Sequence, residues 1–217
     1  FFESPSMTTS ADFAADVQAL ITRRIRQDVQ GMHAYAVQDS KGMVKLDAME
    51  NPHRLPAELQ EALGRRLGAL ALNRYPDGRV NDLRQALAAY AVMPEGFDIM
   101  LGNGSDELIS LLAMACDVPG ASILAPLPGF VMYAMSAQLQ GVPFHGVPLT
   151  ANFELDEAAM LSAIATHKPA VVYLAYPNNP TGTFTARSEI ARLHAGLPSD
   201  VMLVIDQAYA EYVAPEL

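Results

Sequence analysis

Short apolar runs alternate with segments of helical periodicity from Asp98 onward. The runs are rich in β-branched and aliphatic residues, and in chain order they read "DIMLG", "SILAPL", "VPFHGVPL", "AVVYLAY" and "VMLVIDQAY". Between them, segments such as "GFVMYAMSAQLQG" and "LDEAAMLSAIATH" have the spacing and length of helices. Because strand-like runs alternate with helices, the pattern predicts an α/β domain whose mainly parallel sheet is covered by helices on both faces.

The upstream region has a different pattern. Residues 11–30 predict one helix, and "MVKLDAMENP" predicts a short extended arm. A further helix with a stripe of leucines is expected to start at Pro56. After a turn at "NRYPDGR", Asn81 is expected to cap another helix. We therefore expect an N-terminal helix and arm over residues 1–54, followed by a large domain over residues 55–217.

Composition narrows the function classes. The chain has 217 residues, of which 51% are hydrophobic, so it can bury a sizeable core. A formal charge of −10, with basic residues clustered only in "TRRIRQ", argues against a nucleic-acid partner. No window approaches about twenty apolar residues. The first residues also lack the features of a signal peptide, so we expect a cytosolic protein with no membrane partner.

Cysteine and histidine usage gives no sign of a disulfide framework or a metal site. The single cysteine, Cys116, excludes an intrachain disulfide, and its place in "LLAMACDV" predicts a helix-core residue rather than a reactive thiol. The histidines are not spaced as ligands with a cysteine or carboxylate partner. We therefore predict that no metal is bound.

A glycine-containing turn, "LGNGSDE", precedes a predicted helix. Backbone N–H groups at such a helix start can hold a phosphate without any basic side chain. The alternative is purely structural: Asp106 and Glu107 complement the helix dipole, and Ser105 acts only as a cap.

Polar and aromatic residues also follow the later strands. Phe130 comes after "SILAPL", where its ring can stack on a flat heterocycle or serve as a core contact. Asn179 lies in "YPNNPTG", in which Pro180 and the flexible Gly182 shape the turn after a buried strand. Because ligands of open α/β sheets bind beyond the carboxyl ends of the strands, these side chains are candidates for a binding site.

Asp206 ends the last predicted strand, and Tyr209 follows it. A carboxylate at the mouth of a buried strand is costly unless it has a cationic or hydrogen-bonding partner, and a protonated ring nitrogen would be such a partner. The alternative is an aspartate that caps the next element.

The order of these motifs resembles the fold-type I aminotransferases, and specifically the histidinol-phosphate aminotransferase family. The resemblance covers roughly residues 35–213, and it rests on "KLDAMENP", "RYPDG", "GNGSDE", "PGFVMY", "YPNNPTG" and "DQAYAEY". It implies the large domain of an aspartate aminotransferase-like pyridoxal-phosphate enzyme with an N-terminal helical arm, and no C-terminal small domain in this chain.

The resemblance also implies a role for each motif in holding pyridoxal 5'-phosphate. The backbone of Ser105, Asp106 and Glu107 would bind the cofactor phosphate, and Phe130 would stack on the ring. Asp206 would pair with the ring nitrogen and keep it protonated.

Further contacts are implied to the phenolate oxygen of the cofactor, to the partner subunit and to the substrate. Asn179 and Tyr209 would donate to the phenolate oxygen, and Asp206 and Tyr209 are the catalytic candidates within this chain. Tyr75 would reach across a homodimer interface to the partner's cofactor phosphate. Tyr35, and Asn51 in the "ENP" arm, would cover the substrate.

One part of the family pattern is missing. The family carries its Schiff-base lysine in a segment after the motif that matches Asp206 and Tyr209. The lysines here are Lys41, Lys45 and Lys168, and none has that context. We therefore expect the sequence to be the N-terminal portion of a longer enzyme and the 217-residue chain alone to be inactive.

The function implied by the resemblance is transamination between histidinol phosphate and 2-oxoglutarate in histidine biosynthesis. Alternatives within the superfamily are aminotransferases of aromatic amino acids or aspartate, and a threonine-phosphate decarboxylase-like enzyme. An alternative of another class is a non-catalytic domain that binds a phosphorylated ligand. A Rossmann-type nucleotide-binding domain is disfavoured because its glycine fingerprint is lacking.

Overall fold

The computed structural model describes residues 10–33, 39–45, 50–76, 78 and 80–213. Their contacts group into two compact units, one from residues 1–31 and 101–217 and the other from residues 32–100. The domain boundary predicted at residue 54 stays a prediction. The candidate site lies wholly within the first unit.

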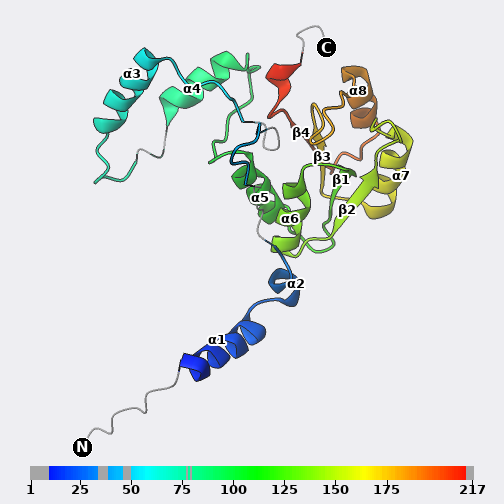
Figure 1. The fold of residues 1–217 in the computed structure, drawn as a ribbon. Helices are drawn as coiled ribbons and strands as arrows, with labels where there is room; N and C mark the ends of the chain where they lie inside the picture. The colour runs from blue at the N-terminus through cyan, green and yellow to red at the C-terminus, as the bar shows by residue number, and fades with distance from the viewer. Residues whose placement is uncertain (1–9, 34–38, 46–49, 77, 79, 214–217) are drawn as a thin grey trace, which may run out of the picture. The chain divides into compact units, whose positions relative to one another are not determined.

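A four-stranded parallel sheet forms the centre of the first unit (Figure 1). Its strands are β1 (Ile123–Leu127), β2 (Phe144–Pro148), β3 (Val171–Ala175) and β4 (Met202–Asp206). They lie in the order β2-β1-β3-β4, and each neighbouring pair is parallel. From β1 the chain continues to β2 on one side, and from β3 it continues to β4 on the other side. Open α/β sheets form a ligand crevice between two strands whose connections diverge in this way. The predicted α/β fold is confirmed.

Helices cover both faces of the sheet (Figure 1). On one face lie α5 (Ser105–Ala115) and α6 (Val131–Gln140), and on the other lie α7 (Glu157–His167) and α8 (Arg187–Ala195). Side chains alternate between the two cores, so that Tyr173 on β3 packs with α5 and α6. This burial on both faces explains why the strands read as nearly continuous apolar runs.

The first predicted strand is absent from the described residues. Asp98–Gly102 has no strand assignment there, and Met100 is largely exposed. The Asp98 carboxylate instead accepts a hydrogen bond from the backbone N–H of Ile99 at 2.8 Å and pairs with Arg84. An apolar run as short as this needs a neighbouring strand to satisfy its backbone, and the described residues provide none.

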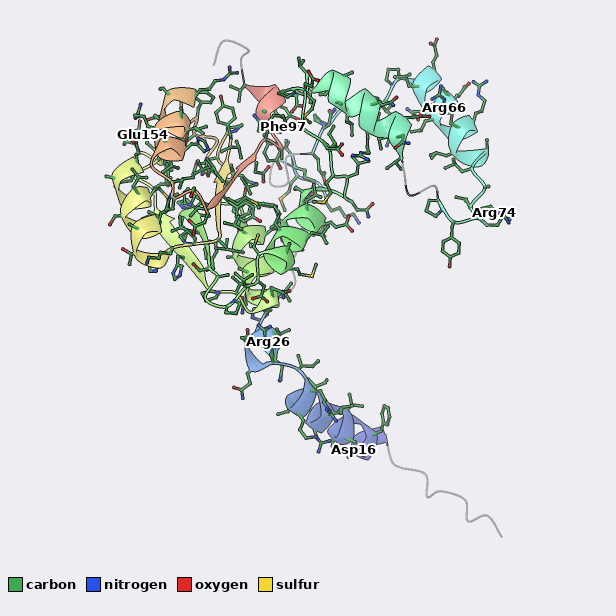
Figure 2. All side chains as sticks on the ribbon, turned by 180° about the vertical axis from the view of Figure 1, so that it is seen from behind. Asp16, Arg26, Arg66, Arg74, Phe97 and Glu154 are labelled. Atoms are coloured by element: carbon green, nitrogen blue, oxygen red, sulfur yellow. The ribbon has the colours of Figure 1, made fainter. Side chains whose placement is uncertain are left out.

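The single helix predicted over residues 11–30 is in fact two, α1 (Ser10–Arg24) and α2 (Gln27–Gln30). At the break, Arg26 leaves helical geometry and donates hydrogen bonds to the carbonyls of Leu139 and Gln138 at 3.1 and 2.6 Å. These carbonyls lie in the last turn of α6, and that of Gln138 also accepts a hydrogen bond from the backbone N–H of the cap residue Gly141 at 3.0 Å. Arg26, labelled in Figure 2, thus joins α2 to the C-terminus of α6.

The second unit contains α3 (Ala57–Gly68) and α4 (Asn81–Tyr90). The helix predicted to start at Pro56 starts one residue later, with Pro56 in the cap position, and Val80 rather than Asn81 occupies the cap position of α4. The leucine stripe is exposed, and its members are Leu55, Leu59, Leu63, Leu67 and Leu70. Across the described parts of both units, no helix combines the length and apolar character needed to cross a bilayer.

Candidate functional site

A cleft lies at the carboxyl ends of β1, β3 and β4, beside the start of α5. It is lined by Ser105, Phe130, Ala175, Pro177, Asn179, Asp206, Ala208 and Tyr209. Five of these are residues that the sequence singled out, although they come from four separate motifs. The parallel sheet brings these motifs together because all of its strands end at one edge.

The turn before α5 presents a helix start to this cleft. Gly104 is the cap residue and no side chain caps the helix, so Ser105 is its first residue rather than the predicted cap. The N–H groups of the first turn therefore have no helical or capping partner and can hold an anion. Ser105 lines the cleft, whereas Asp106 and Glu107 do not. Glu107 turns back and accepts a hydrogen bond from the backbone of Asn103 at 2.5 Å.

Phe130 makes the expected core contact and also lines the cleft. The chain turns sharply after β1 at Gly129, where an added Cβ would lie 2.4 Å from the carbonyl oxygen of Pro126. Phe130 follows, half-buried against the core, with its ring edge-to-face with that of Tyr133 at a centroid distance of 5.6 Å. It also lines the cleft, so an aromatic surface is available beside the ends of the strands.

The two asparagines of "YPNNPTG" have different surroundings. The Asn178 amide donates to the carbonyl of Pro128 at 3.1 Å and to the hydroxyl of Thr181 at 2.8 Å, which ties the turn after β3 to the turn after β1. Gly182 has a φ of 69°, as its predicted flexibility allows. Asn179 lines the cleft half-buried, and its side chain makes no hydrogen bond to any described residue. Its amide is therefore available to a ligand.

Asp206 is held by neutral donors. Its Oδ2 accepts a hydrogen bond from the Tyr133 hydroxyl at 2.8 Å, and its Oδ1 accepts one from the backbone N–H of Ala208 at 3.1 Å. The second bond means that Asp206 also caps the following turn, which was the structural alternative. Throughout the described residues, no lysine, arginine or histidine forms an ion pair with this half-buried carboxylate. A carboxylate so placed favours a cationic ligand.

Tyr133 is the site residue that sequence reasoning missed. Its ring is buried and stacks on Tyr173, with centroids 4.4 Å apart and planes 7° from parallel. Burial, and then the negative charge of Asp206, raise the pKa of Tyr133, so the phenol remains a donor. The signal was available: a tyrosine on the buried face of a helix needs a partner for its hydroxyl.

Tyr209 lies in the turn between β4 and the short helix η1 (Ala210–Tyr212). It is half-buried and lines the cleft, and its ring lies 6.3 Å from that of Tyr212. Its hydroxyl makes no hydrogen bond to a described residue, so like the Asn179 amide it is available to a ligand.

Of the other predicted site residues, two belong to the second unit and one lies outside the described residues. Tyr75 is fully exposed in the second unit, and Asn51 is exposed there with its side chain accepting a hydrogen bond from the backbone of His53 at 2.9 Å. Tyr35 lies outside the described residues. Lys168 ends α7 just before β3, at the opposite edge of the sheet from the cleft. The roles predicted for the first three stay predictions.

The chemistry of the cleft fits pyridoxal phosphate. Phe130 offers an aromatic face, Asp206 an anion for a protonated ring nitrogen, and the start of α5 offers N–H groups for a phosphate. Asn179 and Tyr209 add neutral donors suited to a ring oxygen. Among the residues that the structure describes, no cluster of three or more His, Cys, Asp or Glu is placed to hold a metal ion.

Comparisons with known proteins agree with this chemistry. The family model described as "Aminotransferase class I and II" matches residues 41–217. The chain is 71% identical to the histidinol-phosphate aminotransferase of Polaromonas naphthalenivorans over 195 residues, which are 89% of this chain and 53% of that protein. It is 64% identical over 200 residues to the enzyme of the same name from Methylibium petroleiphilum, again covering 89% and 53%.

A solved structure shares the fold. The histidinol-phosphate aminotransferase of Sinorhizobium meliloti, determined in complex with pyridoxal-5'-phosphate, matches with a TM-score of 0.72 at 24% identity. The match covers 88% of this chain and 52% of that one. The chain thus spans about half the length of the curated relatives it matches.

Proposed function

The chain belongs to the aminotransferases of class I and II, and from this we propose that the protein transfers an amino group between histidinol phosphate and 2-oxoglutarate with pyridoxal phosphate as cofactor. The observation that carries the proposal is Asp206. It is a half-buried carboxylate in a polar cleft, and no cationic partner accompanies it within the described residues. A protonated pyridine ring supplies the missing charge.

The residues of this chain would hold the cofactor and set its charge. When bound, pyridoxal phosphate supplies an electron sink for the charge left after a substrate carbon loses its proton. Asp206 would keep the ring nitrogen protonated, and Phe130 would fix the plane of the ring. Asn179 and Tyr209 would donate hydrogen bonds to the ring oxygen, and the first turn of α5, beginning at Ser105, would bind the phosphate.

The proposed substrate rests on likeness to named relatives. Identities of 71% and 64% to two histidinol-phosphate aminotransferases are high enough to favour the same reaction in histidine biosynthesis. Transamination of aromatic amino acids or aspartate, and decarboxylation of threonine phosphate, are other outcomes that an assay would distinguish.

We extend the proposal to assembly and location. The protein is proposed to work as a cytoplasmic homodimer in which Tyr75 reaches the partner's cofactor phosphate. Its full exposure is consistent with such a role, because an exposed aromatic ring is free to enter a partner's surface. Tyr35 and Asn51 are proposed to cover the substrate.

We also propose that the 217-residue chain alone does not transaminate. Of its three lysines, only Lys168 belongs to the same unit as the cleft, and it lies at the opposite edge of the sheet. The unit that holds the cleft therefore has no lysine placed to act as the nucleophile of the family's covalent step.

The test is an assay of the protein at its natural length. Purified enzyme, supplied with pyridoxal phosphate, histidinol phosphate and 2-oxoglutarate, should form glutamate, and phenylalanine or aspartate as donor should give a far smaller kcat/KM. An Asp206→Ala variant serves as the inactive control. A preference for another amino donor would show that the proposed substrate is wrong. Failure to bind pyridoxal phosphate at all would overturn the proposed function.

A further inference from the structure

We propose that Tyr133 is a positioning residue that holds the Asp206 carboxylate turned toward the cleft. The inference rests on the proposed function, because it concerns the carboxylate that would pair with the cofactor ring nitrogen. Tyr133 itself does not line the cleft. Its effect on the reaction would therefore pass entirely through Asp206.

Packing around Tyr133 fixes the position of the hydroxyl that donates to the Asp206 carboxylate. Tyr133 belongs to α6 and Asp206 ends β4, and their side chains meet with 2.8 Å between Oη and Oδ2. The tyrosine ring is 2% exposed and is held between Tyr173, stacked at 4.4 Å, and Phe130, edge-to-face at 5.6 Å. A ring packed on two sides cannot swing away, so the hydroxyl is a fixed donor.

Among the described residues, the groups that face Asp206 carry no positive charge, so the hydrogen bond from Tyr133 matters for stabilising the carboxylate. Tyrosines face Asp206 from α6, from β3 and from the turn after β4, namely Tyr133, Tyr173 and Tyr209. On α5, the carboxylates of Asp106 and Glu107 are exposed to solvent. Because none of these groups is cationic, hydrogen bonds from neutral donors stabilise the carboxylate anion.

Tyr173 provides an internal control. It lies in the same stack and is fully buried, but its hydroxyl has no hydrogen-bond partner among the described residues. Tyr173→Phe therefore removes a buried hydroxyl without removing a hydrogen bond to Asp206. Tyr133→Phe removes a hydroxyl of the same size together with the hydrogen bond. Comparing the two variants separates the hydrogen bond from general effects of losing a phenol.

The experiment measures the affinity of the natural-length apo-protein for pyridoxal 5'-phosphate between about pH 4 and 9. Loss of the donor removes a hydrogen bond from the anionic carboxylate on which binding depends, so the acid limb of the affinity profile should move to higher pH in Tyr133→Phe. A hydrogen bond to a charged group predicts a shift of about one pH unit. Tyr173→Phe should leave the limb within about 0.2 units of the wild type because it leaves the hydrogen bond intact.

A second variant covers the case in which Tyr133→Phe does not fold. Incorporation of 3-fluorotyrosine at position 133 keeps the ring and makes the phenol a stronger donor, so the limb should move to lower pH. An unchanged limb in whichever variants fold would refute the positioning role.

Asp206→Asn separates this failure from failure of the proposed function. If that variant binds pyridoxal phosphate as tightly as the wild type, the ring-nitrogen pairing itself is wrong. If it binds weakly while the Tyr133 variants leave the limb unchanged, the pairing stands and only the role of Tyr133 is lost.

Discussion

The Tyr133 hydroxyl donates a hydrogen bond to the Asp206 carboxylate at 2.8 Å, across a sequence separation of 73 residues. One partner is part of the buried core between α6 and the sheet, and the other lines the cleft. This side-chain contact thus links the packing of the core to the site. Substitutions near this pair should therefore separate effects on stability from effects on binding.

Tyr173→Phe should stabilise the protein. The Tyr173 hydroxyl is buried with no hydrogen-bond partner in the part of the chain that the structure describes, and burial is the main cause that raises its pKa to about 12. Removing an unsatisfied polar group while keeping the ring should raise the free energy of unfolding by about 1 kcal/mol. Urea unfolding at neutral pH measures this, with Tyr133→Phe as the matched variant that should instead lose stability. A loss in both variants would show that the Tyr173 hydroxyl has a partner in solution.

Substituting the two neighbouring asparagines should affect different properties: the stability of the protein for Asn178 and its affinity for the cofactor for Asn179. Asn178→Ala removes hydrogen bonds to Pro128 and Thr181 and should lower the free energy of unfolding by about 1–3 kcal/mol. Asn179→Ala removes no hydrogen bond to a described residue, so stability should change little. Affinity for pyridoxal phosphate should fall about three- to tenfold in Asn179→Ala.

Unfolding curves and cofactor titrations on both asparagine variants make the comparison. The assignment fails if Asn179→Ala binds the cofactor like the wild type.

Stability should depend on the protonation of His145. Its ring stacks on that of His167 with centroids 3.7 Å apart. Burial, and then His167, lower the pKa of His145 below the ordinary 6.5. Between the folded-state pKa and 6.5, the unfolded chain binds the proton and the folded chain does not. The free energy of unfolding should therefore increase as the pH is raised through this window and decrease as the pH is lowered through it.

His145→Asn should flatten that slope. The free energy of unfolding is measured at a series of pH values below and above neutrality for the wild type and the variant. His194→Asn, which changes an exposed histidine on α8, is the control and should keep the wild-type slope. An equal slope in all three proteins would show that His145 titrates normally.

Arg26→Ala should loosen the N-terminal helices without unfolding the sheet. The guanidinium group joins α2 to the last carbonyls of α6, and it also pairs with Asp28. Without these bonds, local opening around α1 and α2 should become easier. Limited proteolysis should cut this region faster than in the wild type, while the urea midpoint stays nearly unchanged. Arg23→Ala, a change to a helix arginine for which no hydrogen bond to a described residue is found, should leave the cleavage rate unaltered.

Sequence reasoning located most of the cleft because its signals are local. Breaker residues after apolar runs marked the strand ends, and a parallel sheet places those ends at one edge. It could not find the Tyr133–Asp206 contact, which depends on how α6 packs against the sheet. The sequence also could not show the break at Arg26, because it depends on hydrogen bonds to α6, which is distant in the sequence. The strand expected at Asp98 failed for a related reason, since a strand needs a neighbouring strand and the described residues provide none.

The central claim is that Asp206 pairs with a protonated ring nitrogen. Its most direct test is the ¹⁵N chemical shift of ring-labelled pyridoxal 5'-phosphate bound to the natural-length protein near neutral pH. The wild type should give the shift of a protonated pyridine, and Asp206→Asn should give that of a neutral ring and bind at least about 30-fold more weakly. A neutral ring in the wild type, or a protonated ring in both proteins, would contradict the account.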